Sequence, residues 1–440
     1  MIAQFVQEHL NDDTARLILD RARWPQIDID LAVNCIESRR KLKGKVQEWY
    51  DNPDLIFPLK LSAEQCSSSA TGSYKAGYAK SIFEQTSMSD NTTERLSDRK
   101  MRLADLTGGY GVDSWSFSKV ADQVLYCEML SVLCDAAKHN FAALGAANIQ
   151  VENITVAPYS HPEPSCHPER YERPLSNVLE IFKPDIIYLD PARRSETGKK
   201  VFLIEECTPD VLTLKDELFT HSRNILIKLS PMADITMVCD RLGKCCREVR
   251  AVASGGECKE LLIWMDREWS DEYTITAVEL PSHPGFSSLT FAPSEEKSLS
   301  PILASKEDIA QATHLFEPGK ALMKSGAFNI LCHRYGLKKL GRSTHYYIIG
   351  SSIDSSNAAT ADQLTALGKL YSIVSQSPLD KRSIKAAGAA YPKSEVTARN
   401  IPMDTDTLRK KLGIISGDDA HIFGLKSDTA GNLLLICQRM

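Results

Sequence analysis

Apolar residues change their spacing along the chain close to residue 100. Before that point, "TARLILDRA" and "IDLAVNCIESRRKLKGKVQEWY" carry them three and four positions apart, which predicts amphipathic helices. After it, short apolar runs such as "QVLYCEM", "DIIYLD" and "NILIKLS" alternate with helical patterns. Buried strands that alternate with helices predict an α/β fold, a mostly parallel sheet covered on both faces.

The end of this sheet has a different pattern. "REVRAVAS" and "ELLIWMD", joined by "GGECK", predict a closing antiparallel hairpin. Beyond about Asp271 the alternation weakens, and we predict a helix over 305–316, a longer helix over 319–336 and a strand over 344–351. The pattern predicts an N-terminal helical region at 1–90, an α/β domain at 91–268, and one or two small α+β domains after it.

Composition adds a prediction about partners. Hydrophobic residues make up 43% and charged residues 25% of the chain, with a net charge of −5, as in ordinary globular proteins. Residues 320–411, however, hold 15 Lys/Arg against 6 Asp/Glu. This basic stretch predicts a phosphate-binding surface, with a scatter of solvated cations as the alternative reading.

The cysteines and the N-terminus bear on location. Twelve cysteines are scattered without a CxxC pair, which favours reduced thiols in the cytoplasm and no metal site. The first residues, "MIAQFVQEHL", lack a basic flank and a long apolar core, so we expect no signal peptide. No apolar run is long enough for a membrane helix, and we expect no membrane partner.

Two motifs carry candidate chemistry. In "LADLTGGYGVD", a strand ends at Asp105 and a glycine-rich turn follows, while Glu128 ends the next strand, where an acid can accept ribose hydroxyls. The form D-x-x-G-G-x-G suits S-adenosylmethionine better than a dinucleotide; a plain tight turn is the alternative. In "IIYLDPARR", Asp190 ends a buried strand and two arginines follow, which indicates either a catalytic edge or a solvated strand end.

The sequence resembles class I S-adenosylmethionine-dependent methyltransferases, and more closely a Bacteroidetes type with C-terminal ferredoxin-like and THUMP-like domains. The blocks that carry the resemblance are "EQCSSSATGSYKA", "DLTGGYGVDS", "IYLDPARR", "IKLSPMAD", "ECKELL", "LFEPGKALMKSGAFNIL" and "LRKKLGIISGDDAHIFG". The resemblance covers nearly the whole chain. It implies a Rossmann-like core at 91–268, a ferredoxin-like domain at 269–350 and a THUMP-like domain at 351–440.

The resemblance and the motifs together give a set of expected site residues. For the cofactor, S-adenosyl-L-methionine, the set is Asp105, Thr107, Gly108, Gly109, Gly111, Asp113, Glu128, Asn153 and Asp190. For catalysis the set is Asp190, Arg193 and Arg194, with the arginines holding a phosphate or base edge. For substrate binding the set is Lys75, Lys228, Ser230, Cys258 and Glu260. The helix that carries Lys75 could instead pack on the core, and Lys228 and Ser230 could simply end a strand.

The reaction is less closely specified. Methyltransferases of exocyclic base amines commonly carry an aromatic residue after the strand acid and proline, where this chain has Ala192 and Arg193. The "DPAR" segment resembles uridine-C5 RNA methyltransferases, but Leu229 stands where those enzymes have a nucleophilic cysteine. Cys258 is either a relocated nucleophile or, as we favour, a small residue in a turn.

We therefore predict a methyltransferase that acts on RNA, on a base of tRNA or rRNA, held by the THUMP-like region. The expected partner is RNA, tRNA above all, with no obligate protein partner. Two alternatives remain: methylation of a protein or small molecule with the C-terminal region as a scaffold, and an RNA-binding protein without catalysis.

Overall fold

The structure, a computed structural model, describes residues 1–89, 99–156, 174–193, 204–280, 287–350 and 358–440. The chain divides into two compact units, of which the first holds 1–247 and 261–271 and the second holds 248–260 and 272–440. The boundary therefore runs twice through the hairpin of strands β8 (Cys246–Ser254) and β9 (Glu257–Asp266). None of the described helices is long and apolar enough to cross a lipid bilayer.

The first unit contains the predicted sheet, in the strand order β9-β7-β4-β1-β2-β3. Its parallel members pair in register, with Asp105 opposite both Tyr126 and Tyr188, and β9 runs antiparallel to β7. Strand β4 is buried at every position, because both faces of the sheet are covered. The remaining strands are β1 (Arg102–Asp105), β2 (Gln123–Glu128), β3 (Ile149–Asn153), β4 (Ile186–Leu189) and β7 (Asn224–Leu229), with a two-stranded ribbon of β5 (Ala192–Arg193) and β6 (Cys207–Thr208).

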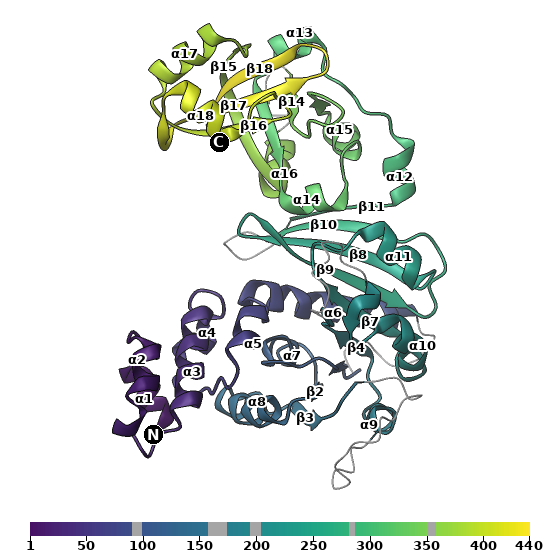
Figure 1. Cartoon of the computed structure of the whole chain (residues 1–440). Coiled ribbons are helices and arrows are strands. Elements are labelled where there is room, and N and C mark those ends of the chain that lie inside the picture. The colour runs from purple at the N-terminus through teal and green to yellow at the C-terminus, as the bar shows by residue number, and fades with distance from the viewer. Residues whose placement is uncertain (90–98, 157–173, 194–203, 281–286, 351–357) are drawn as a thin grey trace. The chain divides into compact units, whose positions relative to one another are not determined.

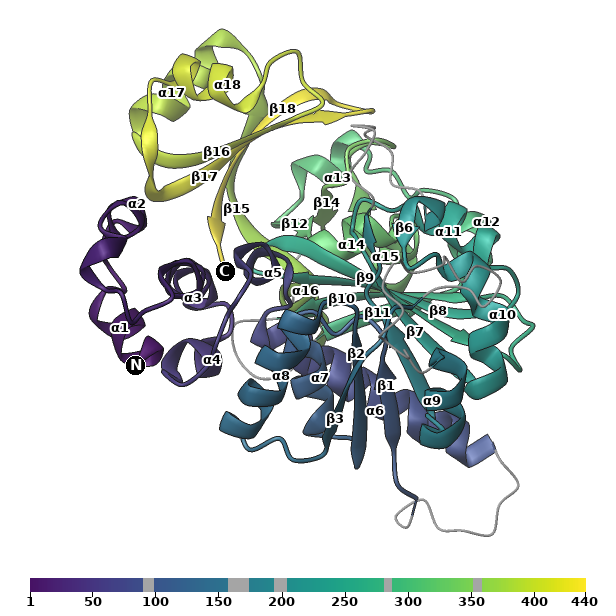
Figure 2. The ribbon, with the colours of Figure 1, turned by 60° about the horizontal axis from the view of Figure 1, so that its bottom comes forward.

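Helices cover both faces of this sheet. Figures 1 and 2 show α6, α7 and α8 on one side of the strands and α9, α10 and α11 on the other. Asp210 and Asp234 cap the N-termini of α10 and α11 by accepting backbone N–H groups, so the sequence itself sets where these helices begin. The bounds are α6 (Ser69–Ser89), α7 (Val112–Ser118), α8 (Ser131–Ala143), α9 (Leu175–Phe182), α10 (Val211–His221) and α11 (Ile235–Leu242), with a short 3-10 turn at Ile204–Glu206.

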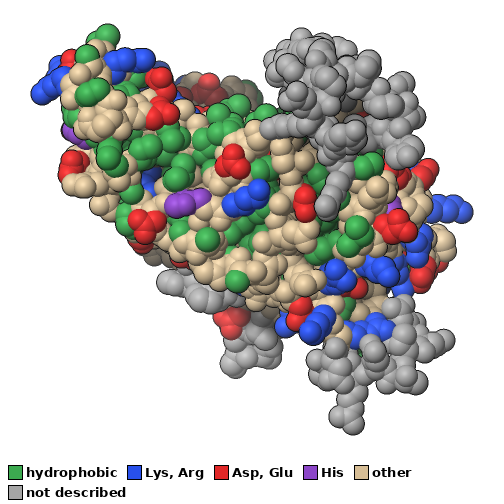
Figure 3. Space-filling view, turned by 90° about the horizontal axis from the view of Figure 1, so that it is seen from below, with side chains coloured by type: hydrophobic (Ala, Val, Ile, Leu, Met, Phe, Trp, Pro, Cys, Tyr) green, Lys and Arg blue, Asp and Glu red, His purple; other side chains and the backbone are tan. Residues whose placement is uncertain are grey.

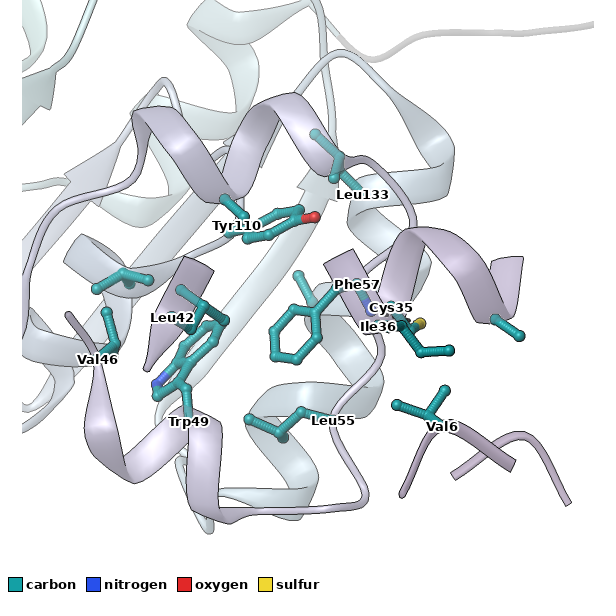
Figure 4. Close-up of a cluster of buried hydrophobic side chains, with 14 of the residues drawn as sticks. Val6, Cys35, Ile36, Leu42, Val46, Trp49, Leu55, Phe57, Tyr110 and Leu133 are labelled. Atoms are coloured by element: carbon teal, nitrogen blue, oxygen red, sulfur yellow. Dashed lines mark hydrogen bonds between the residues drawn. The ribbon is translucent and has the colours of Figure 1, made fainter. Parts of the chain in front are cut away.

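The N-terminal helices share one apolar core with the glycine-rich turn. Trp49 and Phe57 stack with ring centroids 6.2 Å apart, and Phe57 lies 5.6 Å from Tyr110 of the turn. Figure 4 shows these side chains pointing toward one another. This packing anchors the turn from the side opposite the sheet. The helices are α1 (Ile2–Glu8), α2 (Thr14–Leu19), α3 (Ile29–Leu42), α4 (Gln47–Asp51) and α5 (Lys60–Gln65), with a 3-10 turn at Arg21–Arg23.

The second unit contains one further group of paired strands and a seven-stranded sheet. Residues 248–254 of β8 run parallel to β10 (Thr274–Leu280), which pairs antiparallel with β11 (Ser287–Phe291). A seven-stranded sheet follows the order β13-β14-β12-β15-β18-β17-β16. Its strands are β12 (His314–Pro318), β13 (Lys338–Lys339), β14 (Tyr347–Ile349), β15 (Gly368–Pro378), β16 (Lys393–Arg399), β17 (Ile415–Ser427) and β18 (Gly431–Arg439). The helices are α12 (Pro293–Ser298), α13 (Lys306–Ala310), α14 (Lys320–Ser325), α15 (Ile330–Tyr335), α16 (Ala358–Leu367), α17 (Lys381–Ala390) and α18 (Thr405–Leu412).

Two of the element predictions in the second unit were wrong. The helix expected over 305–316 ends at Ala310, and strand β12 begins at His314. The longer helix expected over 319–336 is two helices, because Gly326 ends α14 with a backbone φ of 77°. Helix α15 begins only at Ile330. A left-handed glycine at this position is a common C-terminal stop for a helix.

Acidic and basic side chains are interspersed on the surface that Figure 3 shows, with apolar side chains between them. This distribution agrees with the small net charge of −5. Among the described residues no group of three or more His, Cys, Asp or Glu is arranged to hold a metal ion.

Candidate cofactor and substrate site

The turn after β1 requires glycine at two positions. A Cβ atom on Gly108 would lie 2.1 Å from the ring of Tyr126, and one on Gly111 would lie 2.5 Å from Phe141. Gly111 also has a φ of 86°, which L-residues rarely adopt. The Tyr126 hydroxyl donates to the carbonyl oxygen of Gly109 at 2.6 Å. The turn is thus pressed onto β2 and α8, and its backbone is held at the edge of the sheet.

Asp105 is a buried carboxylate at the start of this turn. Its side chain accepts hydrogen bonds from the Ser114 hydroxyl at 2.5 Å and from the Thr107 N–H at 3.0 Å. Within the described part of the chain no Lys, Arg or His forms an ion pair with it. Burial raises the pKa of Asp105 to about 7, with Ser114 opposing the shift and Asp113 adding to it. A cation placed beside Asp105 would offset the free-energy cost of burying its charged carboxylate.

Glu128 connects the turn to the end of β2. Its carboxylate accepts the Gly109 N–H at 3.0 Å and the Leu130 N–H at 2.8 Å. Asn153, at the end of β3, donates to the carbonyl oxygens of Glu128 and Met129 at 2.8 and 3.0 Å. Glu128 and Asn153 therefore shape one loop at the carboxyl ends of neighbouring strands, where open α/β sheets bind their ligands.

Lys75, on helix α6, lies beside Asp113 of helix α7, which directly follows the glycine-rich turn. Its side chain is fully buried, and its ammonium lies 3.1 Å from Asp113 and 2.7 Å from the Ser67 hydroxyl. Asp113 also accepts hydrogen bonds from Ser67 and from Tyr188, at 3.0 and 2.8 Å. Burial alone would raise the pKa of Asp113, but Lys75 and then Lys228 outweigh burial and lower it. Helix α6 therefore packs on the core and also places the Lys75 cation inside it.

Asp190 and Lys228 form an ion pair between the ends of β4 and β7. The Asp190 N–H donates to the Thr107 hydroxyl at 2.6 Å, which joins β4 to the glycine-rich turn. The Asp190 side chain is 33% exposed and that of Lys228 is 14% exposed, so the acid remains accessible. Ser230, the first residue after β7, accepts the Met232 N–H at 3.2 Å and shapes the loop that follows the strand.

The remaining predicted residues are placed less completely. The backbone of Arg193 pairs with Cys207 in the β5–β6 ribbon, whereas Arg194 lies outside the described residues. Cys258 and Glu260 belong to the second unit. Burial raises the pKa of the Cys258 thiol to about 11, so the thiol is protonated at neutral pH, and Glu260 is only 2% exposed.

Sequence reasoning missed three residues that hold the site in place. Ser114 binds Asp105, and Tyr188 and Ser67 both bind Asp113. The only signal for Tyr188 is a hydroxyl in an otherwise apolar buried strand, since a buried hydroxyl needs a hydrogen-bond partner. Ser114 and Ser67 carry no comparable signal, because small polar residues also occur at helix starts and in loops.

The residues present fit a cofactor with a positively charged amino group and a ribose. Asp105 offers a buried carboxylate that no cation of the described segments pairs with, and Glu128 offers an acid at the next strand end. Gly109, between them, leaves open space where a Cβ would otherwise stand, with only the Thr107 carbonyl oxygen near, at 3.9 Å. A ligand can therefore approach the backbone of this turn closely.

Comparisons with known proteins found matches to two C-terminal domains and to the whole chain. Residues 314–354 match the family model of a ferredoxin-like domain, and residues 368–439 match that of a THUMP domain-like region. The chain is similar over its full length to a protein of Porphyromonas gingivalis W83 whose crystal structure is described as that of a "putative methyltransferase". The identity is 25%, the match covers 97% of that chain, and the TM-score is 0.79. The search of the curated proteins found no match.

Other solved structures share smaller parts. A SAM-dependent methyltransferase of Agrobacterium tumefaciens matches 44% of this chain and 61% of its own, with 13% identity and a TM-score of 0.28. An rRNA methylase of Streptococcus thermophilus matches 43% of this chain and 94% of its own, with 8% identity and a TM-score of 0.27. Likeness at this level carries no functional argument. The full-length match and the two domain matches confirm the predicted fold class and the predicted resemblance.

Proposed function

We propose that this chain is an S-adenosylmethionine-dependent methyltransferase that acts on a base of tRNA or rRNA. The observation that carries the proposal is Asp105, a buried carboxylate beside a glycine-rich turn that forms no ion pair within the described residues. A sulfonium cofactor brings an ammonium group, which is the partner that this carboxylate lacks. We further propose the four-domain division at 1–90, 91–268, 269–350 and 351–440, a cytoplasmic location, and no obligate protein partner.

The cofactor contacts follow from the edge of the sheet. Asp105 would hold the amino group, the backbone from Thr107 to Gly111 would line the amino-acid portion, and Glu128 would accept the ribose hydroxyls. Asn153 would border the adenine through the loop that it shapes. Asp113 would support the site through Lys75 rather than touch the ligand, since its oxygens already contact Lys75, Ser67 and Tyr188. The cofactor supplies an electrophilic methyl group.

Asp190 is the residue that we assign to the substrate. Its carboxylate would orient the methyl acceptor and take up the proton that the methylated atom releases. Lys228 holds this carboxylate in place through the observed ion pair. Arg193 and Arg194 would contact a phosphate or a base edge, and Ser230 would border the same opening. Because methyl transfer is an in-line displacement, positioning supplies much of the rate enhancement.

RNA is favoured as the substrate by two features of the second unit. Residues 368–439 match the THUMP domain-like model, and residues 320–411 carry 15 Lys/Arg against 6 Asp/Glu. A basic module supplies salt-dependent affinity for phosphates. Methylation of a protein or small molecule, and RNA binding without catalysis, are the alternatives that the experiment must separate.

The test is transfer of tritium from labelled S-adenosylmethionine to RNA from a strain that lacks the gene. We expect label in that RNA, none in RNA from the parent strain, and a loss of at least about 100-fold in the Asp190→Asn variant. Asp216→Asn, a change on helix α10, serves as the control. RNA that stays unlabelled while the protein binds S-adenosylhomocysteine would exclude RNA as the substrate. Absence of cofactor binding would exclude the methyltransferase itself.

A further inference from the structure

A cavity of about 400 Å³ in the second unit has no role in the proposed transfer step. Its lining includes Phe328, Lys339, Arg342 and His345. The volume is within the roughly 300–1,000 Å³ typical of small-molecule sites. It combines two ring systems with two cations, a combination that suits a ligand with both a planar and an anionic part.

Lys339 is a buried cation that lines this cavity. Its residue is 3% exposed, and its ammonium donates to the carbonyl oxygen of Arg342 at 3.2 Å and lies 5.5 Å from the centre of the Phe328 ring. Over the described ranges it forms no ion pair with a carboxylate. Burial lowers the pKa of Lys339, because the charged form is poorly solvated there. A buried ammonium of this kind gains stability when an anion reaches it.

His345 lies against Phe328 on the same cavity. Their ring centroids are 3.8 Å apart and the rings are inclined by 19°, so the two form a stacked pair. Buried Nδ1 of His345 has no hydrogen-bond partner in the part of the chain that the structure describes. Burial, and then Lys339 and Arg399, lower the pKa of His345 to about 4, so the ring is neutral at physiological pH. The charges that act on this ring are therefore positive.

The carboxylate of Glu296 lines the cavity and that of Asp428 lies close to it, and both accept backbone N–H groups. Glu296 accepts the N–H groups of Asn329 and Ile330 at 2.7 and 2.8 Å. Asp428 accepts the N–H of Arg342 at 2.8 Å. The Arg342 side chain is exposed, and its guanidinium forms no ion pair across the described segments. Lys339 and Arg342 can therefore both turn to a ligand anion.

We propose that this cavity holds one nucleotide of the RNA substrate, with its phosphate on Lys339 and Arg342 and its base against the Phe328–His345 pair. The inference rests on the proposed function, since it names where the second unit holds that substrate. Stacking of bases on aromatic rings is tolerant of sequence, whereas a phosphate contact fixes position. The pocket would therefore grip a single-stranded nucleotide rather than read a duplex.

The test measures binding of a 5′-fluorescein-labelled oligouridine to the full-length protein by anisotropy. We expect Arg342→Glu to weaken binding about tenfold and Phe328→Leu to weaken it about fivefold or more. Lys385→Glu, an equal charge change on exposed α17, should cost about twofold or less. Lys339→Met should match Arg342→Glu. Adenosine 5′-monophosphate should displace the oligonucleotide better than inorganic phosphate at the same concentration, since only the nucleotide offers a ring.

Methylation of the RNA and binding of S-adenosylhomocysteine are measured on the same protein samples. Equal losses for Arg342→Glu and Lys385→Glu would overturn the pocket, because they would reflect general charge attraction. Unchanged binding by Phe328→Leu would overturn the base contact. If the wild-type protein methylates RNA in either case, the proposed function stands without the pocket. A wild-type protein that binds the cofactor but neither binds nor methylates RNA overturns both.

Discussion

Two buried lysines, Lys75 in the first unit and Lys339 in the second, differ in their partners. In the first unit, Lys75 faces Asp113, Lys228 faces Asp190, and two arginines converge on Asp266. In the second unit, Lys339 is equally buried, yet it forms no ion pair within the described residues. A buried cation without a partner costs free energy that the fold must supply elsewhere. We interpret Lys75 as a charge that stabilises the fold and Lys339 as a charge that a ligand anion would pair.

Asp105 is a buried charge of the first unit that resembles Lys339 in this respect. It lies in the first unit, but like Lys339 it is buried without an opposite charge among the described residues, and its pKa shifts accordingly. The two unpaired groups have opposite signs. Asp105 suits a ligand cation and Lys339 suits a ligand anion. On this interpretation Asp105 marks a binding site in the first unit and Lys339 marks one in the second.

Substitution of Lys75 tests most directly whether its charge stabilises the fold. Lys75→Met leaves Asp113 buried without its cation, so we expect a loss of about 3–5 kcal/mol in the free energy of unfolding. All five tryptophans lie in the first unit, and their fluorescence in a urea titration therefore reports this unit alone. Lys80→Met, an exposed change on the same helix, should stay within about 0.5 kcal/mol.

Lys339→Met is the counterpart in the second unit. Because it orphans no carboxylate, we expect thermal unfolding, followed by circular dichroism, to show a change below about 1 kcal/mol in either direction. A cost as large as that of Lys75→Met would show that Lys339 is a structural charge, and the contrast between the units would disappear.

Gly111→Ala tests the packing of the cofactor turn. The new methyl group would lie 2.5 Å from Phe141 on a backbone with positive φ, so we expect a loss of about 3 kcal/mol. Gly145→Ala has a similar φ of 70° and open space around it, and it should cost only about 1 kcal/mol. Tryptophan fluorescence during urea unfolding measures both. Equal losses would mean that strain, rather than the contact with Phe141, dominates.

The charge of Asp105 predicts a pH dependence. Its pKa in the folded protein is raised to about 7, so at pH 6 the carboxyl is mostly protonated and must release a proton to pair with a ligand ammonium. Affinity for S-adenosylhomocysteine should therefore rise about tenfold between pH 6 and pH 8 by calorimetry. Asp105→Asn should bind more weakly and with a flat profile; a sloped profile in this variant would assign the titration to another group.

The same shift affects stability with a definite sign. A raised pKa in the folded state means that the protonated form favours folding. The stability that this proton contributes is fully present below the ordinary pKa of an aspartate, 3.8, and is lost as pH rises through the folded-state pKa of about 7. Unfolding of the first unit without cofactor, followed by fluorescence at pH 5 and pH 8, should show this loss in the wild type. Asp105→Asn should show less of it.

Cys258→Ser should have the smallest effect. Burial raises the pKa of this thiol to about 11, so little thiolate exists at neutral pH. We expect methyl transfer within about twofold of the wild type, as for the control Cys245→Ser. A loss above about 100-fold, together with a covalent protein–RNA adduct that can be trapped with the wild type, would instead identify Cys258 as a nucleophile.

The fold could be predicted largely from the sequence because its signals are local. Apolar runs mark the strands, and the glycines at 108 and 111 stand where side chains would meet Tyr126 and Phe141. The break at Gly326 was missed because a glycine within a helical pattern is often tolerated. Lys75 and Asp113 were both expected in the site, but their contact could not be predicted, for a different reason. Lys75 and Asp113 are 38 positions apart, and only the packing of α6 brings them together.

The cavity in the second unit could not be predicted from the sequence either. In the basic cluster "RYGLKKLGR", Lys338 and Lys339 look alike, but Lys338 pairs with Asp308 at 2.6 Å while Lys339 points inward. Alternation along a two-residue strand is too short to reveal which lysine is buried. Phe328 and His345 come from separate segments, and no spacing in the sequence links them.

The division of the chain at the β8–β9 hairpin limits how this protein can be cut or grafted. Residues 248–260 fold with the C-terminal unit, although they precede residues 261–271 of the N-terminal unit. A fragment that begins at residue 272 would leave strand β10 without its neighbour β8 and expose an edge prone to aggregation. During synthesis, the first unit likewise cannot acquire its β9 segment until a piece of the second has already left the ribosome. Gene fusions that swap only one unit must therefore exchange two separate stretches of sequence.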